Sequence, residues 1–263
     1  MAEALSLWHA ATRGLVVMAV LGLFAWAVCC LRHNVALVDR VWSWFFMAGA
    51  AAYALALPAL GPRAPWVAGL LLVWGLRLSA HITWRSWGHA EDRRYQAMRQ
   101  RHSPHFVLKS LGLVFGLQAL IAWCVSAPLL AALASPRPLG LLDAAGIALT
   151  LFGTVFEAIA DWQLLRFQRD ASQRGRVMDQ GLWRFSRHPN YFGEACVWWG
   201  LSLLAFGAGA AWTVFSPLLM TLLLLKVSGV TLLEHGIAQR RPGYADYVRR
   251  TNAFVPGPRR PAP

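Results

Sequence analysis

The sequence predicts an all-α integral membrane protein, a bundle of about seven transmembrane helices. Hydrophobic residues make up 57% of the 263 residues, charged residues only 14%, and the mean hydropathy is +0.43. A soluble domain carries about a quarter charged residues. The chain also contains several apolar runs of the roughly 20 residues that a helix needs to cross a bilayer. We therefore expect a single multi-pass transmembrane domain over residues 1–263.

Seven apolar runs are candidate spans. They cover residues 13–31, 41–60, 64–84, 106–134, 139–165, 191–209 and 212–233. The second run can begin as early as Val35. Proline and glycine predict turns between several runs, at 60–62, 135–140 and 207–209. The first run lacks a small-residue cleavage site, so we predict a membrane span and not a removed signal peptide.

The net charge of +13 predicts how the chain is oriented in the membrane. Six lysines or arginines fall in each of three segments, 85–109, 166–187 and 240–260. Seven spans put all three segments on one side, which the positive-inside rule assigns to the cytoplasm. We therefore expect an inner or plasma membrane protein with its amino end outside and its carboxyl end in the cytoplasm. No DNA-binding module accompanies the charge, so no nucleic-acid partner is expected.

Several acidic side chains lie at or inside the predicted spans, where each costs about 2.5–3.5 kcal/mol on insertion scales. They are Asp39, Glu157, Asp161, Glu194 and Glu234. Glu157 and Asp161 are four residues apart, so both carboxylates share one helix face, which Leu164 continues. Asn190 and Glu194 repeat this spacing in the next run. We expect these acids to converge on a cytoplasm-facing pocket; pairing between helices for assembly alone is the alternative.

The stretch 181–194 leads into the sixth run and predicts an anion site. Pro189 fits the first turn of a helix, where its missing N–H costs nothing. The N–H groups and partial positive charge of a helix start attract phosphate. Arg176, Arg184 and Arg187 precede this start and can fork onto phosphate oxygens. We expect the phosphates of a nucleotide cofactor here, with phospholipid headgroups as the alternative ligand.

Other kinds of site have little support in the sequence. The histidines of 102–105 lack a cysteine or carboxylate at zinc spacing, so no metal site is expected. No dinucleotide-binding or phosphate-binding glycine loop and no Gly-x-Ser-x-Gly motif occurs. A transporter would require inverted repeats or broken helices around a midplane site, and the sequence contains neither.

Along nearly its whole length the chain resembles the membrane family grouped with the steroid 5-alpha-reductase carboxyl-terminal domain, in particular a prokaryotic branch of it. The stretch from Arg187 to Glu194 is the part specific to the superfamily. Further matching positions are 38–42, Arg77, Arg85, 91–95, Gln118, 157–163, 181–200, 228–230, 233–234 and 241–256.

This resemblance implies an enzyme similar to 3-oxo-5-alpha-steroid 4-dehydrogenases. Such an enzyme uses NADPH to reduce a conjugated C=C bond of a lipophilic enone or enoyl substrate. It also implies N-terminal, substrate-side spans over 13–105, a cofactor-binding half over 106–256 and a tail over 257–263. The chain departs from the steroid enzymes at Glu157, where they carry asparagine, and at Gly175, where they carry a cofactor-facing tyrosine.

The roles of individual residues are expectations from this resemblance and from charge. An oxyanion that develops on the substrate needs a hydrogen-bond donor in a low-dielectric pocket. Asp39 or Glu194, kept protonated by apolar surroundings, or the phenol of Tyr191 could supply it. The residues predicted to bind the cofactor are Glu157, Asp161, Leu164, Arg176, Arg184, Arg187, His188, Asn190, Glu234 and Tyr244.

A second resemblance leaves the cofactor open. Residues 187–191 also look like the Arg-His-Pro-x-Tyr signature of isoprenylcysteine carboxyl methyltransferases, in which this segment holds S-adenosylmethionine. The later glutamate and Tyr-x-x-Tyr pattern of that family resembles Glu234 and Tyr244 to Tyr247. The alternative function is therefore methyl transfer from S-adenosylmethionine to a lipophilic acceptor.

Overall fold

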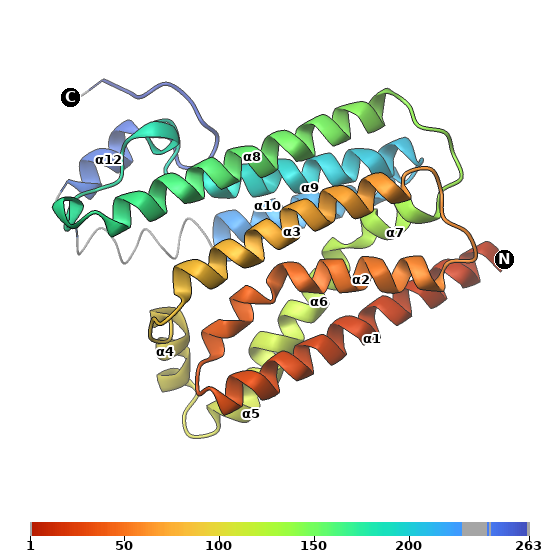
Figure 1. Cartoon of the computed structure of the whole chain (residues 1–263), viewed down its shortest axis with the longest axis horizontal. Coiled ribbons are helices and arrows are strands. Elements are labelled where there is room, and N and C mark those ends of the chain that lie inside the picture. Colours follow the sequence, from red (N-terminus) through yellow and green to blue (C-terminus); the bar gives the residue numbers. More distant parts are fainter. Residues whose placement is uncertain (1, 228–240, 242, 262–263) are drawn as a thin grey trace. The chain divides into compact units, whose positions relative to one another are not determined.

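The computed structural model describes residues 2–227, 241 and 243–261 (Figure 1). Helices dominate this part of the chain and no strand occurs in it, so the predicted all-α class is confirmed. The chain forms two compact units. The first comprises Met1–Gly140 with Leu204–Thr213, and the second comprises Leu141–Leu203 with Val214–Pro263. The predicted single domain, with halves that meet at residue 105, stays a prediction.

The first unit contains the α-helices α1 to α7, together with a 3-10 helix and a π-helical stretch. The α-helices are α1 (Ala2–Leu31), α2 (Trp42–Ala56), α3 (Ala64–Ser86), α4 (Arg93–Arg101), α5 (Phe106–Ser110), α6 (Leu117–Val125) and α7 (Ala127–Ala134). A 3-10 helix, Val35–Arg40, precedes α2, and a π-helical stretch, Leu111–Gly116, joins α5 to α6.

The second unit contains two long helices and a set of shorter ones. They are α8 (Leu141–Arg169), α9 (Pro189–Gly207), α10 (Phe215–Leu222) and α12 (Tyr244–Arg250). Short 3-10 helices occur at Ala171–Gln173 and Gly181–Arg184, and a π-helical stretch at Leu223–Val227. The 3-10 helix Ala211–Val214 belongs to the first unit except for its last residue. The last residues of α9 belong to the first unit.

Four helical stretches among the described residues are long and apolar enough to cross a membrane. They are Ala4–Leu31, Ala64–Ser86, Phe106–Val125 and Leu141–Arg169. Each overlaps a predicted span. The predicted runs 41–60 and 191–209 are helical as α2 and α9, and the end of the run 212–233 lies outside the described residues. The sequence and structure therefore indicate a membrane protein, while the number of seven spans stays a prediction.

Two predicted runs are not continuous helices. Residues 35–40 form their own 3-10 helix, so the second run does not start as one helix at Val35. The run 106–134 is interrupted at Ser126, because Pro128 near the start of α7 has no N–H to continue the hydrogen-bond ladder of α6. The Ser126 hydroxyl lies 2.6 Å from the hydroxyl of Tyr53, which ties this break to α2.

Close packing of α1 on α2 holds the first unit together; Figure 1 shows the two helices side by side. Gly14 of α1 lies directly against the ring of Tyr53, and Gly49 of α2 lies against the Met18 side chain. Both glycines are contact points where an added Cβ would overlap the facing side chain. The indole of Trp123 on α6 donates to the carbonyl of Ala11, 2.9 Å away.

Candidate functional site

The predicted site residues of the fifth and sixth runs lie on α8 and α9, which meet backbone to backbone. A Cβ added at Gly193 would stand 2.7 Å from the amide nitrogen of Glu157, and one at Gly153 would stand 2.7 Å from that of Val197. One added at Gly200 would stand 2.3 Å from Oγ1 of Thr150. Contact positions rise along α9 as they fall along α8, so the helices are antiparallel.

This contact brings the two predicted i, i+4 pairs to the same level of the helix pair. We call Glu157, Asp161, Asn190 and Glu194 the acid cluster. Its three acids are deeply buried, at 2%, 5% and 8% exposure for Glu157, Asp161 and Glu194. The amide nitrogen Nδ2 of Asn190 donates to Oδ1 of Asp161 across 3.2 Å. The predicted pairs thus come together on facing turns of α8 and α9.

One atom of the acid cluster is available to a ligand. Oδ1 of Asn190 is buried and accepts no hydrogen bond from any residue that the structure describes. A buried acceptor without a donor loses its hydration without compensation, which costs about 1–3 kcal/mol. A ligand N–H or O–H at this position would remove that cost. The cluster therefore has in Oδ1 of Asn190 an acceptor for a donor group of a polar ligand.

The start of α9 lies next to this cluster along the chain. The helix begins at Pro189, as predicted. The amide of the buried His188 donates to Oγ of Ser186, 3.1 Å away, and the Ser186 hydroxyl donates to the carbonyl of Phe254. The imidazole of His188 stacks on the ring of Tyr191, with centroids 5.6 Å apart. Tyr191, a predicted proton donor, is thereby fixed through its ring.

The structure gives Arg187 a different contact from the predicted phosphate. Its Nη1 donates to the carbonyls of Val248 and Thr251, at 3.1 and 2.6 Å, and its backbone amide donates to the carbonyl of Asn252. These carbonyls stand at the carboxyl end of α12, where a positive charge is favourable. Arg187 therefore holds the C-terminal helix, and its contact with phosphate stays a prediction. Sequence reasoning missed the carbonyl contacts because the partners are over 60 residues away.

The C-terminal helix is also fixed to the segment that precedes α9. The hydroxyl of Tyr247 donates to the carbonyl of Trp183 across 2.6 Å, and the indole of Trp183 donates to the carbonyl of Ala160 on α8. Burial raises the pKa of Tyr247, so its phenol stays protonated as this hydrogen bond requires. Tyr244, predicted to bind cofactor, is buried with its ring 5.9 Å from that of Tyr247.

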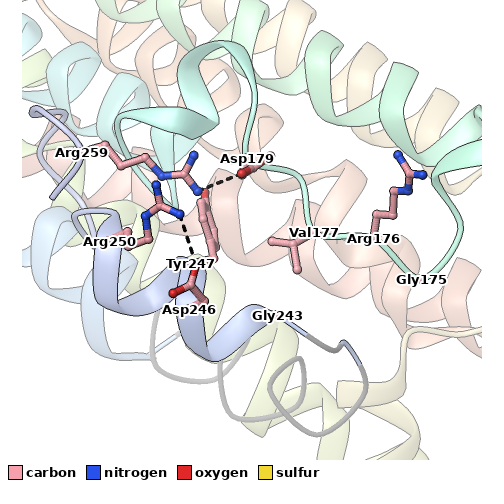
Figure 2. Close-up of a pocket in the computed structure, with 9 residues that line it drawn as sticks. All are labelled: Gly175, Arg176, Val177, Asp179, Gly243, Asp246, Tyr247, Arg250 and Arg259. Carbon is pink, nitrogen blue, oxygen red and sulfur yellow. Dashed lines mark hydrogen bonds and ion pairs between the residues drawn. The ribbon is translucent and has the colours of Figure 1, made fainter. Parts of the chain in front are cut away.

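A pocket of about 450 Å³ opens where α12 meets the loop after α8 (Figure 2). Its lining residues are Gly175, Arg176, Val177, Asp179, Gly243, Asp246, Tyr247, Arg250 and Arg259. Arg259 pairs with Asp179 at 2.8 Å, and Arg250 with Asp246 at 3.4 Å. Figure 2 shows Arg176 apart from both pairs. We call this the arginine pocket.

The arginine pocket has the charge of an anion site. Arg176 is exposed and makes no ion pair with any described residue, so two aspartates face three arginines. The Nε atoms of Arg250 and Arg259 are buried and have no acceptor among the described residues. Sequence reasoning named Arg176 but assigned the arginines of 240–260 only to membrane orientation. The high number of arginines in segment 240–260 was the signal that could have indicated this anion site.

The remaining predicted cofactor residues are spread over the second unit. Arg184 is exposed at the end of its 3-10 helix, and Leu164 is half-buried on α8, one turn beyond Asp161. Glu234 lies outside the described residues. The structure therefore brings together the acid cluster and, separately, the arginine pocket, and it does not show Arg184 or Leu164 in either group.

Asp39, the remaining predicted proton donor, belongs to the first unit and is held as an ion pair. Its Oδ2 lies 3.0 Å from Nη2 of Arg94, and its Oδ1 accepts a 2.6 Å hydrogen bond from the Tyr95 hydroxyl. Burial raises the pKa of Asp39, and the neighbouring Arg94 guanidinium opposes that rise. Both carboxylate oxygens are thus occupied by side chains of α4, which indicates a structural role.

The amino-acid sequence matches a known protein family. The family described as "Protein of unknown function (DUF1295)" matches residues 25–251. The chain belongs to the DUF1295 family. A relative in Schizosaccharomyces pombe, the uncharacterized protein C594.04c, is 28% identical over 276 residues, covering 92% of this chain and 78% of the relative. No solved structure matches the chain. The DUF1295 region contains the whole acid cluster and the pocket arginines Arg176 and Arg250, whereas Arg259 follows it.

Proposed function

We propose that this protein is a membrane reductase that uses NADPH to reduce a conjugated C=C bond of a lipophilic enone or enoyl substrate. The observation that carries the proposal is the acid cluster, with the open Oδ1 of Asn190 buried between carboxylates. A nicotinamide dinucleotide presents the matching donors, an amide NH₂ and ribose hydroxyls. The resemblance of residues 187–194 to the reductase superfamily points to the same ligand.

The residues of the second unit fit the parts of this cofactor. Asn190 would accept from the carboxamide or a ribose hydroxyl, and Asp161 and Glu157 from further ribose hydroxyls. The phosphates carry several negative charges, which suit the arginine pocket with Arg176 and the excess of arginine over aspartate there. Arg184, exposed before α9, is a further candidate for phosphate contact.

The proposed reaction adds one hydride and one proton to the double bond, which is a two-electron reduction. A bound NADPH would supply the hydride for the β-carbon of the substrate, whose carbonyl oxygen would then carry the developing negative charge. Glu194 and Tyr191 on α9 are the O–H donors that we assign to this oxygen, where a preorganised donor is most effective. The α-carbon then takes a proton that derives from solvent. Asp39 has no part in this step.

We further propose seven spans, with the amino end outside and the carboxyl end in the cytoplasm. The three arginine-rich segments then face the cytoplasm, where NADPH is available. In this arrangement the acid cluster and the arginine pocket are open to the cytoplasmic cofactor, and the substrate enters from the lipid. Accessibility labelling of single cysteines introduced at Arg13 and Arg260 tests this orientation.

Ligand-induced stabilisation tests the cofactor. We expect NADPH to raise the thermal midpoint of the purified protein, since a ligand at 100 times its Kd stabilises the folded state by about 2.7 kcal/mol. NADH and S-adenosylmethionine are the comparison ligands. In the Asn190→Ala variant, which lacks the buried acceptor, the stabilisation by NADPH should be smaller. Stabilisation by S-adenosylmethionine and none by NADPH would overturn the proposal and favour the methyltransferase.

A further inference from the structure

The feature that carries a new inference is α4, the short basic helix of the first unit. Its chain neighbours on both sides are candidate membrane spans, Ala64–Ser86 before it and Phe106–Val125 after it. The connection between two such spans lies where they leave the hydrocarbon region. In a membrane, α4 and its flanking residues therefore lie at the level of the lipid headgroups.

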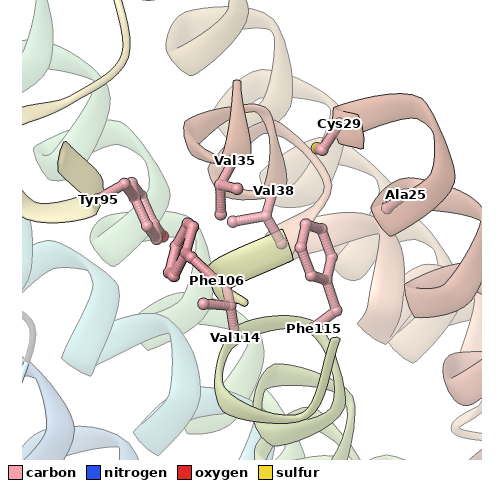
Figure 3. Packing of buried hydrophobic residues seen from close by; sticks show 8 residues of the cluster. All are labelled: Ala25, Cys29, Val35, Val38, Tyr95, Phe106, Val114 and Phe115. Atoms are coloured by element: carbon pink, nitrogen blue, oxygen red, sulfur yellow. The ribbon is translucent and has the colours of Figure 1, made fainter. Parts of the chain in front are cut away.

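One side of α4 is anchored to the rest of the unit. Tyr95 and Phe106 are buried in a cluster with Val35 and Val38, which Figure 3 shows together. Arg99 adds a contact over the ring of Phe106, with its guanidinium carbon 4.9 Å from the ring centroid. These contacts fix α4 to the rest of the first unit.

The acids near α4 are all engaged on this anchored side. Arg94 contacts both Asp39 and Asp92, at 3.0 and 3.1 Å. Arg99 lies 2.9 Å from Oε1 of Glu91, and the same oxygen accepts from the backbone amide of Val35. Three carboxylates thus face two arginines, and Arg85 acts electrostatically on two of these acids, Asp39 and Asp92.

α4 also carries arginines that make no ion pair with a described residue. Arg93 begins the helix and Arg101 ends it, about 80° apart around its axis, and both are exposed. Arg85, exposed at the end of α3, adds a third cation. None of these three arginines makes an ion pair with any described residue. An anionic partner is the electrostatic complement of this surface.

Exposed apolar side chains in the same connection between the two candidate spans, two of them neighbours of Arg85 in the chain, indicate the kind of anion. Trp84 and Trp87 are 61% and 71% exposed, and Leu108 is 66% exposed. Tryptophan is typical of the membrane–water interface, where its ring lies at the headgroup level. A water-soluble anion leaves these side chains in water, whereas a phospholipid covers both the cations and the apolar groups.

We infer that Arg85, Arg93 and Arg101, with the adjoining tryptophans, form a binding surface for the headgroups of anionic phospholipids. This inference is independent of the proposed reductase activity. A basic residue near an anionic membrane surface contributes about fivefold in affinity, so two of them contribute about 25-fold.

Native mass spectrometry of the full chain in detergent tests the inference. The probes are phosphatidylglycerol and phosphatidylcholine with the same acyl chains, and the measured quantity is the ratio of protein bound to each lipid. We expect the wild-type chain to prefer phosphatidylglycerol. Arg93→Gln and Arg101→Gln should each lower this preference about fivefold, and the double variant about 25-fold. The thermal midpoint should stay near wild type, because neither arginine is paired.

The matched control is Arg13→Gln, which removes an exposed arginine of α1 from the same unit. We expect it to keep the lipid preference. An equal loss in this control, or a double variant that still prefers phosphatidylglycerol, would overturn the inference. Inorganic phosphate at constant ionic strength should leave the bound phosphatidylglycerol in place; full displacement by it would assign the surface to free phosphate and also overturn the inference.

Discussion

Acidic side chains differ between the two units in their exposure and in their hydrogen-bond partners. In the first unit, Glu91 and Asp92 lie at the surface end of the bundle, with 11% and 44% of their side chains exposed, and arginines of α4 bind them. In the second unit, the acids of the acid cluster lie between two helices at no more than 8% exposure. There the amide of Asn190 donates one hydrogen bond to Asp161, and Oδ1 of the same Asn190 has no donor among the described residues.

This difference separates acids paired with arginines near the surface from acids buried beside an unpartnered acceptor. An exposed or half-exposed carboxylate with an arginine partner ties elements together at modest gain. Several carboxyl groups buried together cost free energy, and clusters of that kind are typical of functional sites. The comparison predicts that conservative changes in the second unit alter function first, and that changes in the first unit alter stability first.

The largest expected effect is on reduction by the Glu194→Gln variant. Loss of the O–H donor for the developing oxyanion should lower the rate about 100-fold or more. The fold should be retained, because glutamine has nearly the same size. The measurement is NADPH consumption with a panel of lipophilic enones. Glu91→Gln is the matched control in the first unit, and equal rates for Glu194→Gln and wild type would break the comparison.

A smaller effect, on stability, is expected for Gly193→Ala. The new Cβ would stand 2.7 Å from the backbone nitrogen of Glu157, so α8 and α9 must move apart. Overpacking of this kind costs about 1–3 kcal/mol and should also weaken NADPH binding by displacing Glu157. Gly69→Ala on α3, where nothing lies within 4 Å, is the control and should leave the thermal midpoint unchanged or higher. Similar midpoints for both variants would contradict the close helix contact.

Glu91→Gln should lower the free energy of unfolding by about 1–2 kcal/mol. The reason is that the carboxylate of Glu91 accepts from Arg99 and from the amide of Val35, and an uncharged amide binds the guanidinium less well. Thermal unfolding in detergent measures this change. The added stabilisation by NADPH should match that of wild type; if it disappears, the first unit also contributes to the site.

The smallest expected effect is a pH dependence in the first unit. Burial would raise the pKa of Asp92, but hydrogen bonds from the side chain and backbone of Arg94 outweigh it and lower that pKa. A lowered pKa gives stability that is present above the ordinary aspartate value of about 4 and is lost as the pH falls below it. Because Asp92 is 44% exposed, the loss should stay under about 1 kcal/mol. In Asp92→Asn this part of the acid-induced loss should vanish.

Local patterns in the sequence were sufficient for the helices. Apolar runs are a property of 20 neighbouring residues, and Pro189 defines its own helix start. The π-helical stretch Leu111–Gly116 was not predicted, because it lies inside uniformly apolar sequence. The break at Ser126 had a signal in Pro128, which the prediction of one run over 106–134 did not use. The division into two units was also beyond the sequence, since it depends on which helices pack together.

The candidate site was predictable to the extent that it depends on helical spacing. The turn with Asn190 faces the turn with Glu157 and Asp161, since Asn190 donates to Asp161 and Gly193 lies against Glu157. The partners of Arg187 and the lining of the arginine pocket could not be read in this way. Asp179 and Arg259 are 80 residues apart, and only the folded loop brings them within 2.8 Å.

The backbone contacts at the start of α9 have a consequence for how the protein is made. The amide of Arg187 is bound by Asn252, and the carbonyl of Phe185 by the amide of Gly257. Residues 252–257 are synthesised after residues 185–187, so the start of α9 gains these two hydrogen bonds only when the later segment folds back onto it. A chain truncated before Asn252 should lack both of them.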